Sequence, residues 1–494
     1  MVQSANKGID ANVALGSADL RKRLKLDGKE FDAELKRVGN LIEEAGIEIV
    51  RVSFLDAHGI LRTRPIEARH FRQVASNGMP TTSAILSMDT ANNIAVPIFS
   101  ADGGLGREDM GGGGDMYILP DLKTFKSLPW EPKSAMVLGD IYLRSGLRCP
   151  FDPRFQMQEA CARLNAMGLK FMGGVEVECT ILNVTNGRLT MEDSGMPATP
   201  PAVAPLQHGY QYFSSDVVDG AGDLIADLRE ALIGLDLPLR MIEPEWGPGQ
   251  IEITFDPLLD VDAADAVVYL KTAVKQVARR RGMIASFMAT PGLPNAFSTG
   301  WHLHQSLVDC KSGVNAFLSQ DEVISDLGRN FVGGLIEHFA AGAAFSNPTI
   351  NGYKRLNASP LSPKFATWSH HNKGAMVRLI GGPGDQTTHL ENRVGEPAAN
   401  PYLYMASQIF AGLDGIERKI DPGDPVSDPV LLSDKPIMPV DLIHAIEALE
   451  QSSMYSQSLG EEFVNYYLMI QKYAINRFLS TVTDWEHREY FERF

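Results

Sequence analysis

Apolar residues recur at helical spacing in several stretches of the chain. The first stretch covers residues 31–45, ends at Gly46, and carries its apolar side chains at Phe31, Leu35, Val38, Leu41 and Ile42. This pattern predicts an amphipathic helix. Similar patterns predict further helices over residues 154–167, 223–235, 262–281 and 402–419.

Other stretches alternate between apolar and polar side chains. Residues 48–67 read EIVRVSFLDAHGILRTRPIE, and the Asp-Ala-His-Gly at 56–59 is typical of a turn between two strands. The sequence therefore predicts a β-hairpin here, and it predicts strands over residues 170–182 and 250–255 by the same alternation. Helices and antiparallel-looking strands without regular βαβ spacing indicate the α+β class.

The length of the chain bears on its organisation. With 494 residues it exceeds what one hydrophobic core usually holds, so we expect two domains. Residues 1–28 are polar and are interpreted as an N-terminal extension. The predicted division is this extension, a first domain over residues 29–147 and a second domain over residues 148–494.

Composition and charge exclude several classes of protein. The chain has 45 Lys and Arg against 61 Asp and Glu, a net charge of −16, which is unsuited to binding nucleic acid. It has no apolar run long enough for a membrane span and no secretory signal pattern at its start. Four widely spaced cysteines without a CxxC pair favour a reducing compartment, so we expect a cytoplasmic protein.

Carboxylates gather on the predicted strands. Glu176 and Glu178 are two positions apart and so share one face of a strand. Glu245 and Glu252 flank a Gly/Pro turn, Glu391 lies in a third alternating segment, and the segment GWHLHQS brings two histidines. Oxygen-rich sites with an imidazole suit Mg²⁺ or Mn²⁺ better than zinc. For a single carboxylate a solvated strand face is the ordinary interpretation, but several on apolar strands need cations to neutralise them.

Taken in order, the segments GVEVE, EWGPGQIE, GWHLHQS, NGYKRL, NKGAMVRL and HLENRVGEPAANPY resemble the glutamine synthetase superfamily. The resemblance runs from the hairpin near Val50 to WEHREYF near residue 490, about nine-tenths of the chain. It implies a β-grasp-like N-terminal domain and a catalytic domain whose curved antiparallel sheet, flanked by helices, carries the metal ligands. It also implies a homo-oligomer of stacked rings, commonly a dodecamer, with each active site between two subunits.

The resemblance implies two or more Mg²⁺ or Mn²⁺ ions per active site. The first ion would be held by Glu178, Glu245 and Glu252, and the second by Glu176, His302 and Glu391. Binding of ATP is implied for the side chains His304, Ser306, Arg378 and Lys373. Glutamate would be bound by Arg355 at its α-carboxylate and by Arg393 at its γ-carboxylate, with Glu178 also facing the substrate.

The implied reaction is an ATP-dependent ligation through a γ-glutamyl phosphate, which an amine then attacks. In ammonia-using relatives a glutamate stands where this chain has Leu361, and an Asn-Gly pair is replaced by Phe297-Ser298. An acceptor pocket without that carboxylate is less suited to a cation. We therefore expect L-glutamate, ATP and a hydrophobic or aromatic amine such as aniline to be the substrates. These substrates would give the enzyme a role in amine catabolism, such as the degradation of aniline.

Other interpretations stay open from the sequence. Ammonia, a small alkylamine or a polyamine are alternative acceptors, because Asp89 is a candidate for the acid that a neighbouring subunit supplies in the family to take the proton. A scaffold that kept only the fold, or a metal-dependent amide hydrolase, would be a different class of protein. Trp246 and Trp301 lie next to proposed ligands, and core packing is the more common role for such tryptophans.

Overall fold

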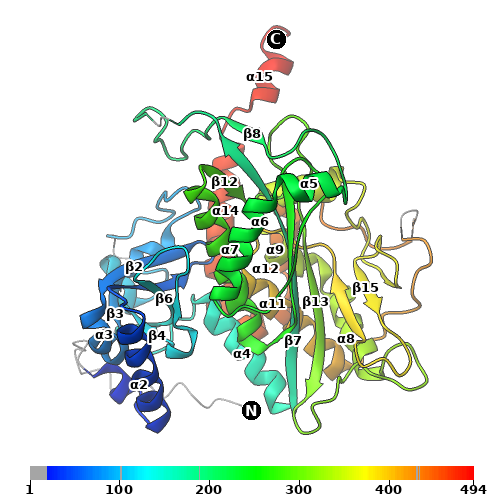
Figure 1. Cartoon of the computed structure of the whole chain (residues 1–494). Coiled ribbons are helices and arrows are strands. Elements are labelled where there is room, and N and C mark those ends of the chain that lie inside the picture. Colours follow the sequence, from blue (N-terminus) through cyan, green and yellow to red (C-terminus); the bar gives the residue numbers. More distant parts are fainter. Residues whose placement is uncertain (1–18, 101–102, 188–189, 430–431, 433) are drawn as a thin grey trace.

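The computed structural model describes residues 19–100, 103–187, 190–429, 432 and 434–494. In Figure 1 the N-terminal part of the chain (blue to cyan) forms a smaller unit beside a larger one built from the remainder. β6 ends at Leu143 and α4 begins at Pro153, so the predicted boundary near residue 148 falls between these two elements. The predicted extension lies largely outside the described residues, but its end forms a short helix, α1, whose Leu20 is buried.

The N-terminal domain is a mixed six-stranded sheet with helices on it. Its strands run in the order β2-β1-β6-β4-β3, with β5 beside β6, and β1 and β6 are parallel. β1 and β2 are the two arms of the predicted hairpin. The elements are α1 Leu20–Arg23, α2 Lys29–Glu44, β1 Ile49–Leu55, β2 Leu61–Glu67, α3 Phe71–Asn77, β3 Met79–Thr82, β4 Asp115–Pro120, β5 Lys126–Ser127 and β6 Ser134–Leu143, with 3₁₀ turns at Ala68–His70, Ser83–Ser87, Glu108–Gly113 and Leu122–Thr124.

The C-terminal domain is built on a curled ten-stranded sheet. Its order is β14-β15-β16-β13-β7-β10-β9, with β8, β11 and β12 also pairing with β7, and every pair except β14 with β15 is antiparallel. The predicted α+β class and curved sheet are thus confirmed. The strands are β7 Leu169–Val184, β8 Val203–Pro205, β9 Leu239–Pro244, β10 Gln250–Phe255, β11 Leu258–Leu259, β12 Met283–Ser286, β13 Trp301–Asp309, β14 Trp368–His370, β15 Val377–Ile380 and β16 His389–Asn392.

Helices surround this sheet, and four of them match the predicted helices to within two residues. These four are α4 Pro153–Ala166, α6 Gly222–Gly234, α7 Asp260–Arg280 and α11 Pro401–Arg418. The remaining helices are α5 Ser215–Gly220, α8 Asp326–Glu337, α9 Phe339–Ser346, α10 Ile350–Ala358, α12 Leu442–Glu450, α13 Ser453–Leu459, α14 Glu461–Leu479 and α15 Asp484–Tyr490.

The central strand β7 has one apolar and one polar face, because its side chains alternate. Val175, Val177 and Cys179 are buried in the hydrophobic core, on the side where α4 and α7 pack against the strand. Glu176 and Glu178 therefore point to the opposite face. That face lies on the side of β7 away from α4 and α7.

A buried arginine joins the two domains. Arg154, near the start of α4, donates to Asp140 of β6 at 2.7 Å, to Asp121 at 2.8 Å and to Asp265 of α7 at 2.9 Å. Its pKa is raised well above the ordinary value, because the charges of these carboxylates outweigh its burial. This network holds the N-terminal sheet against the two helices that support β7.

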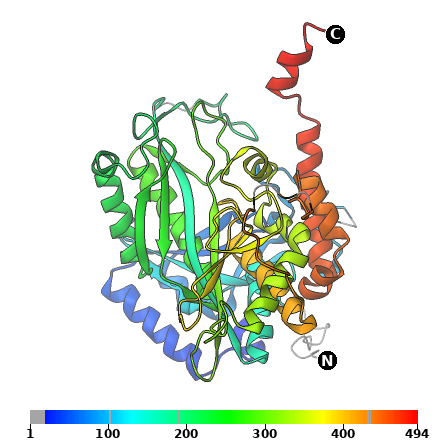
Figure 2. The ribbon, with the colours of Figure 1, turned by 90° about the vertical axis from the view of Figure 1, so that its right-hand side faces the viewer.

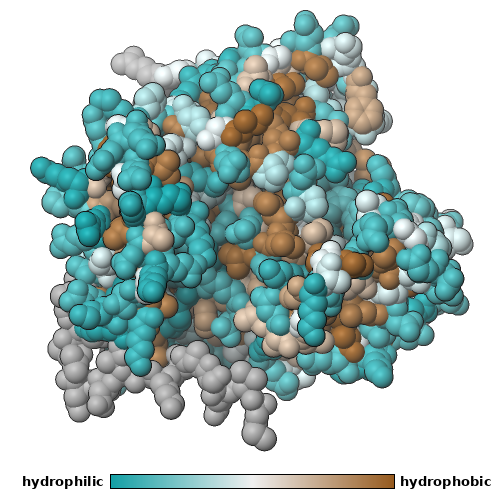
Figure 3. All heavy atoms as spheres, turned by 60° about the horizontal axis from the view of Figure 1, so that its bottom comes forward, coloured by the Kyte–Doolittle hydropathy of each residue, from teal (hydrophilic) through white to brown (hydrophobic). Residues whose placement is uncertain are grey.

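The C-terminal helices lie at the edge of the molecule. Tyr466 of α14 donates to the carbonyl oxygen of Leu86 at 2.8 Å, which ties α14 to the N-terminal domain. Figures 1 and 2 both show the end of α14 and α15 projecting beyond the body. The face in Figure 3 is mostly hydrophilic on the side of the N-terminal domain, with apolar side chains gathered nearer its middle. Within the described ranges, the helices include none that is long and apolar enough to cross a bilayer.

Candidate active site

The strand register brings the expected carboxylates to one face of the sheet. Glu178 of β7 lies opposite Glu252 of β10, and Glu252 lies opposite Glu243 of β9. Glu176 of β7 lies opposite His302 of β13. Residues directly opposite in a ladder share a face. The polar face of β7 therefore continues onto β10, β9 and β13 as an acidic surface.

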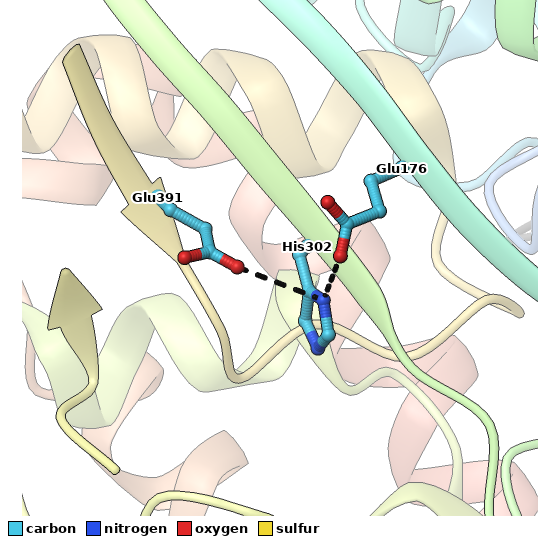
Figure 4. A group of neighbouring side chains, drawn as sticks. All are labelled: Glu176, His302 and Glu391. Atoms are coloured by element: carbon cyan, nitrogen blue, oxygen red, sulfur yellow. Dashed lines mark hydrogen bonds and ion pairs between the residues drawn. The ribbon is translucent and has the colours of Figure 1, made fainter. Parts of the chain in front are cut away.

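Three groups of side chains are close enough to share cations. Ligand atoms lie within 4.8 Å of one another in the groups Glu176/His302/Glu391, Glu178/Glu252/His302 and Glu243/Glu245/Glu252. Figure 4 shows Glu176 and Glu391 pointing toward His302 from two different strands, with His302 Nδ1 at 2.5 Å from Glu176 Oε1 and 3.7 Å from Glu391 Oε1. All six residues expected to bind metal converge here. Their role as ligands stays a prediction.

Glu243 is a further carboxylate of this surface, and it was not expected from the sequence. It precedes Glu245 by two positions in Glu243-Pro244-Glu245, the same spacing as Glu176 and Glu178. This two-residue spacing could have identified Glu243 as a neighbour of the site. It would have done so only if residues 239–244 had been recognised as a strand next to β10.

The electrostatics of the surface fit a cation. Burial raises the pKa of Glu178 to about 7, and burial together with the charges of Glu176 and Glu178 raises the pKa of Glu252 to about 10. Burial likewise raises the pKa of Glu243 and of Glu245. Carboxylates held in this way are stabilised by divalent ions, and oxygen ligands with one imidazole suit Mg²⁺ or Mn²⁺. The residues present therefore fit the metal that the sequence implied.

Two neighbouring histidines stabilise the ionised form of Glu176. Burial opposes its charge, but hydrogen bonds with His302 and His304 outweigh burial and lower its pKa. His304 Nε2 is 2.9 Å from Glu176 Oε2, and His304 Nδ1 is 2.9 Å from His389 Nε2. His304, expected on the nucleotide side, thus contacts the proposed metal site directly.

Two arginines neutralise Glu391. Its carboxylate is fully buried and pairs with Arg378 Nε at 2.5 Å and with Arg393 Nη1. Burial opposes its charge, but His302 and Arg393 outweigh burial, and the pKa of Glu391 is lowered. The two arginines expected at the phosphates and the γ-carboxylate therefore lie beside one proposed ligand.

Two cavities open on the acidic surface, and Glu176 lines both. The nucleotide candidates His304 and Ser306 line a cavity of about 720 Å³, together with apolar residues such as Met172 and Met241. The second cavity has about 700 Å³. Its lining includes the proposed ligands Glu178, Glu245, Glu252 and His302, and the substrate candidates Arg355, Arg393, Leu361 and Phe297. Lys373, assigned to the nucleotide from the sequence, lines this second cavity instead, and Arg378 lines neither of the two.

Arg355 is a buried residue in the lining of the second cavity. Its Nη1 donates to the carbonyl oxygen of Val394 at 2.9 Å, and its Nη2 to that of Arg393 at 3.2 Å. A Cβ on Gly300 would lie 2.6 Å from Arg355 Nη2, so a side chain there would displace the guanidinium. The backbone thus holds this cation in place. Its contact with glutamate stays a prediction.

Aromatic and aliphatic side chains line the outer part of the second cavity. Leu361 is 59% exposed, and Trp246, 44% exposed, packs beside Phe297 with ring centroids 6.3 Å apart. Core packing is therefore the wrong interpretation for Trp246. It is right for Trp301, which is fully buried against Tyr404.

Asp89 lies away from both cavities in this chain. Its carboxylate is fully buried, accepts from the backbone of Ala91 at 2.8 Å and of Asn93 at 2.9 Å, and pairs with Arg477 of α14. The structure does not bring it to the acidic surface. Its supply to a neighbouring subunit's site stays a prediction.

Comparison with known proteins places these observations in a family. The pattern of the glutamine synthetase catalytic domain matches residues 150–490. The chain is 38% identical over 484 residues to the Gamma-glutamylanilide synthase of Acinetobacter sp, an alignment that covers 94% of this chain and 96% of that protein. It is 30% identical to the Glutamine synthetase of Methanosarcina mazei, covering 91% and 96%. Among solved structures, a GmaS/ADP complex superposes with a TM-score of 0.77 at 27% identity, covering 92% and 99%.

Proposed function

This chain belongs to the glutamine synthetase family, and we propose that it joins the γ-carboxylate of L-glutamate to an organic amine with consumption of ATP. Members of the family are ATP-dependent ligases. The proposal therefore concerns which residues act and which amine is accepted.

One observation carries the assignment of roles: the acidic surface lies between two cavities that share Glu176. We assign ATP to the cavity of His304 and Ser306, and glutamate and the amine to the cavity of Arg355 and Arg393. The six proposed ligands would hold divalent ions, which would neutralise the phosphate oxygens of ATP. Such an arrangement would bring the phosphoryl donor and its acceptor together beside Glu176, which both cavities share.

The reaction has two steps. An oxygen of the glutamate γ-carboxylate attacks the γ-phosphorus of ATP, and ADP leaves. The amine nitrogen then attacks the carbonyl carbon of the γ-glutamyl phosphate, phosphate leaves, and the nitrogen loses a proton. Arg355 binds the α-carboxylate by charge-assisted hydrogen bonds, and Arg393 stabilises the charge on the γ-carboxylate and the moving phosphoryl group.

The apolar outer part of the second cavity favours an aromatic amine. Leu361, Phe297 and Trp246 offer no charge to an ammonium group. A lysine-type alkylamine, with a pKa of about 10.4, arrives protonated at neutral pH, whereas a weakly basic arylamine arrives neutral. The relative named Gamma-glutamylanilide synthase supports the same choice. We therefore propose aniline or a similar arylamine as the acceptor.

A second candidate is a cationic acceptor, namely ammonia, a small alkylamine or a polyamine. Glu243 and Glu245 line the same cavity and would attract a positive charge. The relative named Glutamine synthetase supports ammonia in particular. This alternative requires that one of these carboxylates, or Asp89 of a neighbouring subunit, takes the proton.

Phosphate release with an amine panel tests both candidates. Purified protein is given Mg²⁺, ATP, glutamate and one of aniline, isopropylamine, putrescine or ammonium, and kcat/KM is compared. We expect the highest value for aniline. A higher value for ammonium would make the chain a glutamine synthetase, and no phosphate release with any amine would overturn the ligase assignment.

We further propose that the protein is a homo-oligomer of stacked rings in the cytoplasm, with Asp89 near the site of a neighbouring subunit. The described cysteines form no disulfides, which suits a reducing compartment. Light scattering of the purified protein measures the subunit number, and a monomer that retains full activity would contradict sites shared between subunits.

A further inference from the structure

Glu396 is a buried carboxylate that the two reaction steps do not use. It lies three residues after Arg393, and its side chain is fully buried. Its Oε1 accepts from the backbone N–H of Thr349 at 2.8 Å, and its Oε2 accepts from the hydroxyl of Thr349 at 2.8 Å. Both carboxylate oxygens therefore bind one residue, which lies at the start of α10.

Thr349 is the N-cap residue of α10. Its Oγ1 accepts from the backbone N–H of Gly352 at 3.0 Å, which satisfies one of the free donors at the start of the helix. A Cβ on Gly352 would lie 2.8 Å from the carboxyl carbon of Glu396, so only glycine lets the carboxylate approach the first turn this closely. A negative charge in this position also interacts favourably with the helix dipole.

The same helix carries Arg355, whose guanidinium is held by the segment that contains Glu396. Nη1 of Arg355 donates to the carbonyl oxygen of Val394, and its Nη2 donates to that of Arg393. The segment after β16 therefore contacts α10 at two places. One contact is at the first turn through the carboxylate of Glu396, and the other is at Arg355 through two backbone carbonyls.

These two contacts fix Arg355 relative to Arg393. Nη2 of Arg355 lies 3.2 Å from the carbonyl oxygen of Arg393, and both arginines line the second cavity. In the proposed function one arginine binds the α-carboxylate of glutamate and the other binds its γ-carboxylate. With the two cations held in place, a dicarboxylate of the right length reaches both, whereas a shorter one such as aspartate does not.

A carboxylate suits this position better than an amide. Thr349 offers two donors, and a carboxylate answers them with two acceptors, whereas a glutamine side chain would turn its NH₂ group toward one of them. Burial raises the pKa of the Glu396 carboxyl to about 7, against the hydrogen bonds from Thr349 and the charges of Arg355 and Lys271. At a pH above 7 the ionised carboxylate matches both donors.

We propose that Glu396 and Thr349 are positioning residues that hold Arg355 in a fixed place relative to Arg393, so that the two arginines select L-glutamate over shorter dicarboxylic amino acids. This inference rests on the proposed function. It assigns a role to two residues that belong neither to the proposed metal ligands nor to the proposed substrate contacts. Both act through the start of α10.

Three variants and a matched control test the inference. Thr349→Val removes the hydroxyl, Glu396→Gln mismatches one donor, and Thr349→Ser keeps the hydroxyl. Thr483→Val is the control, because Thr483 caps α15 and donates to Glu486 through both its N–H and its hydroxyl at 2.7 Å, on a helix that lines neither cavity. The measurements, at a pH above 7, are KM for glutamate and ATP, Ki of L-aspartate against glutamate, and the Tm of each protein.

We expect Thr349→Val and Glu396→Gln to raise KM for glutamate by about tenfold, the effect of one weakened charge-assisted hydrogen bond, and to leave KM for ATP within about twofold. The ratio of Ki for aspartate to KM for glutamate should fall, because glutamate loses more than aspartate does. Thr349→Ser and Thr483→Val should keep the wild-type values.

Equal changes in KM for glutamate and ATP, an unchanged preference for glutamate over aspartate, or no change in KM would overturn the inference while the ligase assignment stands. Failure of both Thr349→Val and Glu396→Gln to fold would also overturn it, since the contact would then support the whole domain and not the place of one arginine.

A wild-type protein that releases no phosphate with any amine would instead overturn the proposed function. Calorimetric titration with L-glutamate then tests the inference on its own. Weaker binding to Thr349→Val than to Thr349→Ser supports it, and equal binding contradicts it.

Discussion

Glu178 of β7 lies directly opposite Glu252 of β10, so two buried carboxylates face each other across neighbouring strands. Like charges in this arrangement destabilise a sheet. Burial raises the pKa of both groups, to about 7 for Glu178 and about 10 for Glu252. The charge of Arg355 lowers the pKa of Glu178 but does not outweigh burial, so this pair suits a cation as a further partner.

Addition of Mg²⁺ or Mn²⁺ is therefore expected to raise the Tm of the protein without ATP, because only the folded chain assembles the ligands. Glu252→Gln should abolish most of this rise. Its own Tm without metal should equal or exceed that of wild type, since the substitution removes a charge that the fold resists. Thermal melts with and without metal measure both the rise in Tm and the Tm of the variant alone. A variant that keeps the full metal-dependent rise in Tm would contradict the role of Glu252 as a ligand.

Arg355→Ala is expected to raise KM for glutamate at least about tenfold while KM for ATP changes little. The reason is that Arg355 lines the second cavity and not the cavity assigned to ATP. It should also lower the free energy of unfolding by about 1–3 kcal/mol, since the carbonyls of Val394 and Arg393 lose their donor. Steady-state kinetics and urea melts measure the two effects. An equal loss of affinity for glutamate and ATP would count against this assignment.

Leu361→Glu should shift amine preference toward ammonium at little cost in stability, because the side chain is 59% exposed. The ratio of kcat/KM for ammonium to that for aniline should rise about tenfold or more, the effect of one charge near a cation binding site. Leu361→Gln is the matched uncharged control and should move the ratio much less. An unchanged amine profile would mean that Leu361 does not contact the acceptor.

Arg154→Met should destabilise the whole protein by about 3–5 kcal/mol, because it leaves the buried Asp265 and its neighbours without their cation. Arg240→Met is the control. Arg240 pairs with Asp256 at 3.7 Å on an exposed surface, where a salt bridge contributes little. Chemical denaturation of both variants measures the difference, and similar values for the two would refute the importance of the interdomain network.

Glu396 should make stability depend on pH. Burial outweighs its hydrogen bonds from Thr349 and raises the pKa of its carboxyl from 4.5 to about 7. The folded state therefore holds a proton that the unfolded state has lost. The contribution of this group is fully present below pH 4.5 and is lost as pH rises through 7, by about 3 kcal/mol in total. In Glu396→Gln the free energy of unfolding should depend less on pH between 4.5 and 7, as measured by chemical denaturation at several pH values. The same pH dependence in variant and wild type would exclude this role of Glu396.

Much of the fold followed from local pattern. The helices at α4, α6, α7 and α11 and the strands β7 and β10 were predicted from periodicity alone, because each buries one continuous apolar face. The expected ligands were identified by spacing and resemblance, and their convergence required only that their strands be neighbours.

What the sequence determined by itself was which side chains share a face of their own strand, since alternation is a property of the chain. It could not decide which strands lie side by side. Only the tertiary structure set Glu243 beside Glu252, put Lys373 in the second cavity, enclosed Asp89 with Arg477, and packed Trp246 beside Phe297 in the lining of that cavity. These relationships depend on strand order and on loops packed across long sequence distances, which no local pattern contains.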